Sequence, residues 1–113
     1  MASNEAPAYL IICMTHIEGR DLDPRYLELA EGPALKSGHR RIGSGHIGDG
    51  VQLLEGALPS GAQVILLEEF PSMEALRVFW FSDEYQQAIP FRGDSIKIHF
   101  VVAVEAARPT AAT

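Results

Sequence analysis

Residues 64–85 constrain the fold more than any other segment, because an apolar run changes at a proline into a helical pattern. The apolar run begins at Val64 after a Pro-Ser-Gly sequence and predicts a buried strand. Pro71 ends this strand, since proline has no N–H to donate to a neighbouring strand, and Ser72 is suited to cap a helix. One apolar helix face follows at spacings of three and four residues, formed by Leu76, Phe79 and Trp80.

The rest of the chain supplies the other elements. We predict a strand over 9–17, a helix from Asp23-Pro24 to Gly38, an edge strand over 39–50 that returns as a hairpin through 51–55, a short helix from Ser82 to near Pro90 and a last strand over 95–104. The first helix is expected to turn Leu27, Ala30, Ala34 and Leu35 inward. Gly32-Pro33 is expected to kink or interrupt it.

This order of elements predicts an α+β fold. Two strand–helix halves in succession favour the ferredoxin-like split βαβ arrangement, with an antiparallel sheet and two main helices on one face. A length of 113 residues corresponds to one domain, which we place at 8–105. Residues 1–7 and 106–113 are small or polar and are expected to be flexible tails.

The helices can cover only one face of such a sheet. The other face is expected to carry Ile65 and Leu67 from the middle strand and Val101 and Ala103 from the last strand. A monomer would leave this apolar surface in water, so we predict a homodimer in which two sheets pack face to face.

Composition argues against several other classes of protein. The net charge is −6 and the 9 basic residues form no long run, which disfavours nucleic acid and membrane surfaces as partners. The single cysteine, Cys13, cannot form an intrachain disulfide, so a soluble cytoplasmic protein is expected. The glycine-rich run at 43–50 lacks the Lys-Ser/Thr ending of a phosphate-binding loop and no helix follows it. We therefore predict no cofactor.

Several motifs resemble a known bacterial family. They are Leu54-Glu55-Gly56, Glu69-Phe70-Pro71-Ser72, Ser82-Asp83-Glu84-Tyr85-Gln86 and Arg92, together with Asp23-Pro24 and Tyr26 at the start of the first helix. The chain resembles, from Tyr9 to Glu105, the family called domain of unknown function thirteen-thirty. The resemblance implies a dimeric α/β-barrel, the superfamily of antibiotic-biosynthesis monooxygenases, muconolactone isomerases and stress-responsive barrel proteins. It implies no particular activity.

Three of the four histidines are expected at one end of the sheet. His16 closes the first strand and should lie near Lys97 and His99 at the start of the last strand, while His46 projects from the same end. An imidazole is the usual proton-transfer group near neutral pH, so His16 and His99 are candidate acid/base residues, with His46 and Lys97 as candidate substrate contacts. The alternative is that these histidines are scattered and solvated. Their spacing matches no compact metal-ligand motif, and we predict no metal site.

A second group of candidates follows the middle strand. Either Glu68 or Glu69 must face the sheet interior, and we take Glu69 as a candidate base; the alternative is a structural acid paired with an arginine. Trp80, Tyr85 and Arg92 are candidate substrate contacts, in which Arg92 would clamp a carboxylate. The alternative is that Tyr85 packs under its helix while Arg92 forms an ion pair with Asp83 or Glu84.

These residues lead to two hypotheses of function. The first is a small cofactor-independent enzyme, an isomerase, a cyclase or lyase, or an oxygenase, that transfers protons on an organic metabolite. The second is a non-catalytic dimer that binds a small molecule or serves in a stress response. A closed cavity holding a histidine together with a carboxylate or an arginine would favour the enzyme.

Overall fold

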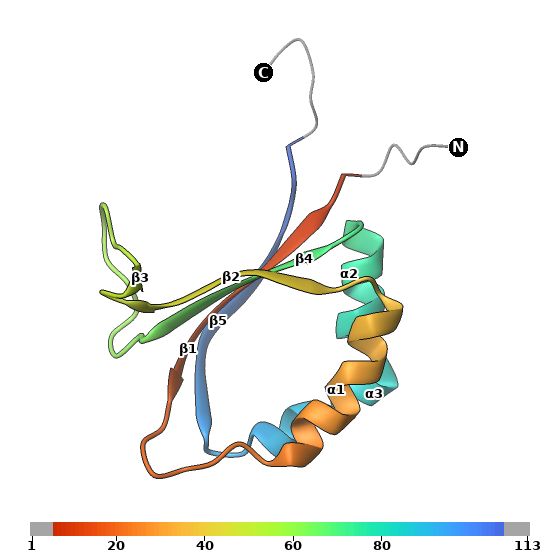
Figure 1. Ribbon diagram of the computed structural model, residues 1–113, viewed down its shortest axis with the longest axis horizontal. Coiled ribbons are helices and arrows are strands. Elements are labelled where there is room, and N and C mark those ends of the chain that lie inside the picture. Colours follow the sequence, from red (N-terminus) through yellow and green to blue (C-terminus); the bar gives the residue numbers. More distant parts are fainter. Residues whose placement is uncertain (1–5, 108–113) are drawn as a thin grey trace.

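The computed structural model describes residues 6–107, in which one layer of helices covers one face of a five-stranded sheet (Figure 1). The elements in chain order are β1 (Ala8–His16), α1 (Pro24–Lys36), β2 (Arg40–Ile47), β3 (Gly50–Val51), β4 (Val64–Phe70), α2 (Met73–Trp80), α3 (Asp83–Ala88), the 3₁₀ helix η1 (Ile89–Arg92) and β5 (Ile96–Glu105). The strand order is β3-β2-β4-β1-β5, and β2, β4, β1 and β5 pair antiparallel. The ferredoxin-like α+β prediction is confirmed.

The predicted flexible tails fall mostly on residues 1–5 and 108–113, which lie outside the described part of the chain. At the described edge of these tails, the Ala106 N–H donates a hydrogen bond of 2.8 Å to the carbonyl oxygen of Pro7. This bond extends the pairing of β1 with β5 by one step. None of the helices within residues 6–107 combines the length and the apolar character that crossing a membrane requires.

Helix α1 begins and ends where the sequence predicts. The Asp23 carboxylate accepts from the Arg25 N–H at 3.0 Å, and Pro24 occupies the first helical position. Gly38 follows the helix with a φ of 73°. A Cβ there would lie 2.7 Å from the Pro71 ring, so this position needs glycine both for its conformation and for its close contact with the turn after β4.

The buried face of α1 differs in part from the prediction. Tyr26, Leu29, Ala30 and Ala34 pack against the core, whereas Leu27 and Leu35 are 61% and 71% exposed. The buried residues recur at helical spacing from Tyr26, and Leu27 and Leu35 fall outside that stripe. The helix spans Pro24–Lys36 as one element that contains Pro33, so Gly32-Pro33 does not interrupt it.

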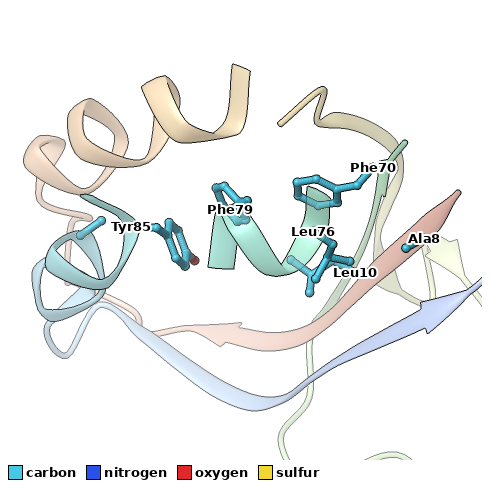
Figure 2. Packing of buried hydrophobic residues seen from close by; sticks show 7 residues of the cluster. Ala8, Leu10, Phe70, Leu76, Phe79 and Tyr85 are labelled. Carbon is cyan, nitrogen blue, oxygen red and sulfur yellow. The ribbon is translucent and has the colours of Figure 1, made fainter. Parts of the chain in front are cut away.

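The core lies between the helices and the sheet. Figure 2 shows the Phe79 ring between Phe70 and Tyr85 in this layer. The ring centroids lie 5.2 Å apart for Phe70 and Phe79 and 4.4 Å apart for Phe79 and Tyr85. The fully packed cluster consists of Ala8, Leu10, Phe70, Leu76, Phe79, Tyr85 and Ala88. These rings join the helices to β4 in a continuous apolar layer.

The open face of the sheet carries Ile65 and Leu67 as predicted, but the prediction for the last strand is wrong. Val101 and Ala103 pair with Ile12 and Leu10, whose side chains face the helices. The reason is a β-bulge: Cys13 pairs with Phe100 and Met14 with Ile98, so His99 is an extra residue in β5. One inserted residue moves all later side chains to the opposite face. The open face therefore receives Phe100, Val102 and Val104.

The predicted hairpin return over 51–55 is also wrong. Only Gly50–Val51 forms a strand, and it pairs in parallel with His46–Ile47 after a tight loop. A Cβ on Gly45 would lie 2.9 Å from the backbone carbon of Gly50, so two glycines permit this close approach. The chain from 52 to 63 then crosses to β4 without a strand.

Candidate functional site

Three polar side chains meet beneath the helices in an otherwise apolar layer. The hydroxyl oxygens of Tyr26 and Tyr85 lie 2.8 Å apart, and Nη2 of Arg92 donates to the Tyr85 hydroxyl at 2.7 Å. The guanidinium of Arg92 also lies over both rings, 5.5 Å from the Tyr26 centroid and 5.9 Å from the Tyr85 centroid. We call Tyr26, Tyr85 and Arg92 the tyrosine–arginine cluster.

Local helix chemistry positions Tyr85. The Ser82 hydroxyl accepts from the Tyr85 N–H at 3.1 Å and donates to the carbonyl oxygen of Phe79 at 2.8 Å. Ser82 therefore caps α3 and ties its start to the end of α2. The Tyr85 ring packs against Trp80 at a centroid distance of 5.2 Å.

Arg92 is positioned by the turn that leads into β5. Its carbonyl oxygen accepts from the Ser95 hydroxyl at 2.6 Å and from the Ser95 N–H at 3.1 Å. The carbonyl oxygen of Ser95 in turn accepts from the Ile17 N–H at 2.8 Å, next to the end of β1. These bonds place Arg92 at the same end of the sheet as His16.

Tyr85 and Arg92 of the cluster are both protonated at neutral pH. Burial is the main cause that raises the pKa of Tyr85, and the adjacent Tyr26 adds to it, so Tyr85 keeps its proton at neutral pH. Burial works to lower the pKa of Arg92, but its contacts with Tyr85 and Tyr26 outweigh this and raise it. Within residues 6–107, Arg92 forms no ion pair with a carboxylate. The alternative in which Arg92 pairs with Asp83 or Glu84 is absent from this structure.

An apolar groove adjoins the cluster through Trp80. It has a volume of about 300 Å³ and runs between α2 and β5. Its lining consists of Leu10, Met73, Leu76, Arg77, Trp80, Phe81, Val101, Val102 and Ala103. Trp80 thus has one side in the groove and contacts Tyr85 of the cluster, while no histidine lines the groove.

The structure does not gather the predicted histidines around the cluster. His99 Nε2 lies 2.7 Å from the Thr15 hydroxyl oxygen, and that hydroxyl also contacts the carbonyl oxygen of Gly61. Because Thr15 has one proton and Gly61 offers only an acceptor, His99 donates from Nε2 to the Thr15 hydroxyl. Thr15 alternates with Cys13 on the open face, so this pair lies across the sheet from the cluster.

The other predicted residues of this group are spread along the sheet. His16 is exposed at the end of β1, opposite Ile96. Because side chains alternate along a strand, His16 lies on the same face as Met14, the face towards the helices. Lys97 is exposed and pairs with Thr15 in the adjoining strands. His46 is exposed near the end of β2, opposite Val64. Of all the predicted site residues, the structure brings together Trp80, Tyr85 and Arg92.

The buried acid of β4 is Glu68. Glu69 lies on the open face and its carboxylate accepts from Arg40 Nε at 2.8 Å, as in the alternative interpretation of that residue. The Glu68 side chain is 8% exposed and lies 2.7 Å from His39 Nε2 and 2.8 Å from Arg41 Nη2. Sequence reasoning missed this carboxylate–imidazole pair.

A pattern of opposite charges in two neighbouring strands could have predicted this pair. The basic pair Arg40-Arg41 faces the acidic pair Glu68-Glu69 in antiparallel strands. His39 then precedes Arg40 and reaches the inner acid, and its ring lies 18° from parallel with Phe79 at a centroid distance of 6.4 Å. In residues 6–107, no group of three or more histidine, cysteine or acidic side chains is arranged to hold a metal ion.

Known structures share this fold at low sequence identity. A protein of unknown function from Rhodopseudomonas palustris has a TM-score of 0.61 and 13% identity over 93% of this chain and 85% of its own. The hydroxynitrile lyase from Passiflora edulis has a TM-score of 0.51 and 11% identity over 96% and 99%. A protein from Bacteroides thetaiotaomicron described as a possible oxidoreductase has a TM-score of 0.51 and 11% identity over 90% and 99%.

No protein with a curated description matches the chain in sequence. The family described as Domain of unknown function (DUF1330) matches residues 7–107, which is nearly the whole chain and includes the motifs around Ser82 and Arg92. The predicted family is therefore confirmed, and this chain belongs to the DUF1330 family.

Proposed function

We propose that the protein is a small enzyme that transfers protons on an organic metabolite without a cofactor. The observation that carries the proposal is the tyrosine–arginine cluster, a charged and proton-donating group set into an apolar layer. Structural proteins rarely bury such groups without an acid partner, whereas enzymes use them to hold and polarise a substrate. A hydroxynitrile lyase has the same fold, which supports the proposal that this protein is an enzyme.

In such an enzyme, the tyrosine–arginine cluster binds the substrate and His16 is the base. His16 lies at the end of β1 near the turn that carries Arg92, and its position in the strand alternation is on the helix side. An imidazole there accepts a proton from carbon while Tyr85, which remains protonated, donates to the oxygen that gains charge. His99 lies across the sheet and is the weaker candidate of the two.

A non-catalytic binding protein is the second candidate. The packing of Phe79 between Phe70 and Tyr85 favours it, because these rings fill the layer that a closed active-site cavity would occupy. The groove beside Trp80 would then hold a ligand that is not transformed.

Hydrogen–deuterium exchange on carbon separates the two candidates without knowledge of the product. Small hydroxy, keto and unsaturated compounds are incubated with the protein in heavy water and followed by NMR. We expect one class of compound to exchange a C–H proton in the presence of the wild type, and His16→Ala to lower that rate about a hundredfold or more. Tyr85→Phe should lower it as well.

The control is Leu35→Ala, which changes an exposed side chain on the outer face of α1 and should keep the wild-type rate. Compounds that raise the melting temperature but never exchange would favour the binding protein. Full exchange in His16→Ala would remove His16 as the base.

A further inference from the structure

We propose that the tyrosine–arginine cluster is a receptor for one carboxylate group, so that the ligand of this protein is a monocarboxylic acid. The inference rests on the proposed function in one respect, that the cluster faces a ligand. It adds the chemical class of that ligand and the residue that recognises it.

Hydrogen-bond capacity is the first argument. Arginine has five N–H donors and no acceptor, and each tyrosine hydroxyl has a single proton. Within the cluster, Arg92 Nη2 donates to Tyr85, the two tyrosine hydroxyls share a hydrogen bond, and Arg92 also interacts with Tyr26. Most guanidinium N–H groups of Arg92 and one tyrosine hydroxyl proton are not used by contacts within the cluster. All of these groups are donors. A ligand that binds to these donors must therefore supply acceptors.

Charge is the second argument. Arg92 is half-buried and has no carboxylate partner within residues 6–107. The nearby cations do not change this balance, because Arg20 pairs with Asp94 and Arg25 with Asp23. The cluster thus carries one uncompensated positive charge in a partly dehydrated place, and a ligand with one negative charge neutralises it.

Shape is the third argument. The rings of Tyr26 and Tyr85 lie against the guanidinium and hold its orientation, and Nη2 is already engaged with Tyr85. The remaining N–H groups project in the guanidinium plane, where a flat carboxylate binds with two parallel hydrogen bonds. The spare hydroxyl proton of the tyrosine pair is a further donor to a carboxylate oxygen. A dianionic phosphate would be only half neutralised here.

Paired probes test the charge directly. Benzoate and acetate, each with its neutral amide, are titrated into the full chain at constant ionic strength and followed by calorimetry and by NMR. We expect both carboxylates to bind and both amides to bind about tenfold more weakly or not at all. Arg92→Met should weaken carboxylate binding about tenfold or more, and Arg92→Lys should restore part of it.

The control is Lys36→Met, which removes an exposed cation at the last position of α1, outside both the cluster and the groove. We expect it to bind benzoate as the wild type does. Wild-type binding of benzoate by Arg92→Met, equal binding of acid and amide, or no carboxylate binding by the wild type would each overturn the inference. Tyr85→Phe keeps the positive charge of Arg92 and removes only its hydroxyl partner. Comparison of the two variants shows whether Arg92→Met binds weakly because it lost the charge or because its packing is disturbed.

The two proposals fail separately. Carboxylate binding that depends on Arg92, with no carbon-bound proton exchanged in any compound, would leave the receptor standing and remove the enzyme. Exchange of a neutral compound by a protein that does not distinguish benzoate from benzamide would leave the enzyme standing and remove the receptor.

Discussion

Tyr85 has two different surroundings along one side chain. Its ring packs against Phe79 and Trp80 in the core, and its hydroxyl meets Tyr26 and Arg92 at the edge of that core. The residue is 3% exposed, so its phenol has little water to replace these partners. Removing the proton from this hydroxyl would bury a negative charge, and the fold resists that change.

The raised pKa of Tyr85 predicts a loss of stability in alkali. In the unfolded chain the phenol titrates at its ordinary value of 10.0, whereas burial raises its pKa in the folded protein. The contribution to stability is therefore complete below pH 10.0 and is lost as the pH rises towards the folded value, because only the unfolded state releases the proton. Urea unfolding at increasing pH should show a steeper decline for the wild type than for Tyr85→Phe. Parallel declines would contradict this, and Tyr9→Phe is the control, since Tyr9 lies on the other face.

Short helices in this protein depend on their caps. Helix α3 has only 6 residues, too few to be stable by itself, yet it carries Tyr85 into the site. Ser82 holds it by accepting from the Tyr85 N–H and donating to the carbonyl oxygen of Phe79. The hydroxyl thus joins two helices and fixes the position of the cluster from the backbone.

Ser82→Ala should lower the free energy of unfolding by about 1–2 kcal/mol, since it removes the cap and leaves the Tyr85 N–H without its partner. It should also weaken benzoate binding, because the start of α3 is then less well fixed. Denaturant unfolding and calorimetry measure the two effects. Ser60→Ala, in an exposed turn, is the matched control and should change neither. A Ser82→Ala protein of wild-type stability would show that packing alone holds α3.

Within residues 6–107, the sheet has an apolar face that no helix covers. Ile65 and Leu67 of β4 and Phe100, Val102 and Val104 of β5 lie on this face on either side of β1, and Val102 and Val104 are 42% and 46% exposed. Figure 1 shows that all the helices lie on the opposite side of the sheet. We propose that a second copy of the chain covers this face, which gives the homodimer expected from the sequence.

Leu67→Lys tests the dimer, because it places a charge near the middle of the open face. We expect the wild type to elute as a dimer in size-exclusion chromatography with light scattering, and Leu67→Lys to elute as a monomer with its helical content intact. The matched control is Leu35→Lys, an exposed leucine on α1 that should leave the dimer unchanged. A wild type that is monomeric in dilute solution would contradict the proposal.

Much of the fold could be predicted from interactions between residues that are close together in the sequence. The N-caps at Asp23, Ser72 and Ser82 and the glycine after α1 act within a few residues, so their side chains and the backbone they bind are neighbours in the chain. Apolar periodicity then ordered the strands and helices, and that order leaves few ways to connect them. The sequence by itself thus determined most of the elements, the family and the ferredoxin-like arrangement.

Which residues lie on each face of the sheet, and which residues form the site, could be determined only from the tertiary structure. The bulge at His99 exchanged the two faces of β5, and it arises from pairing with a strand more than eighty positions earlier. Glu68 and His39 meet only through the register of β2 with β4. Tyr26 and Tyr85 come from helices far apart in the chain. Register and helix packing depend on distant partners, and a sequence pattern read over a few residues does not contain them.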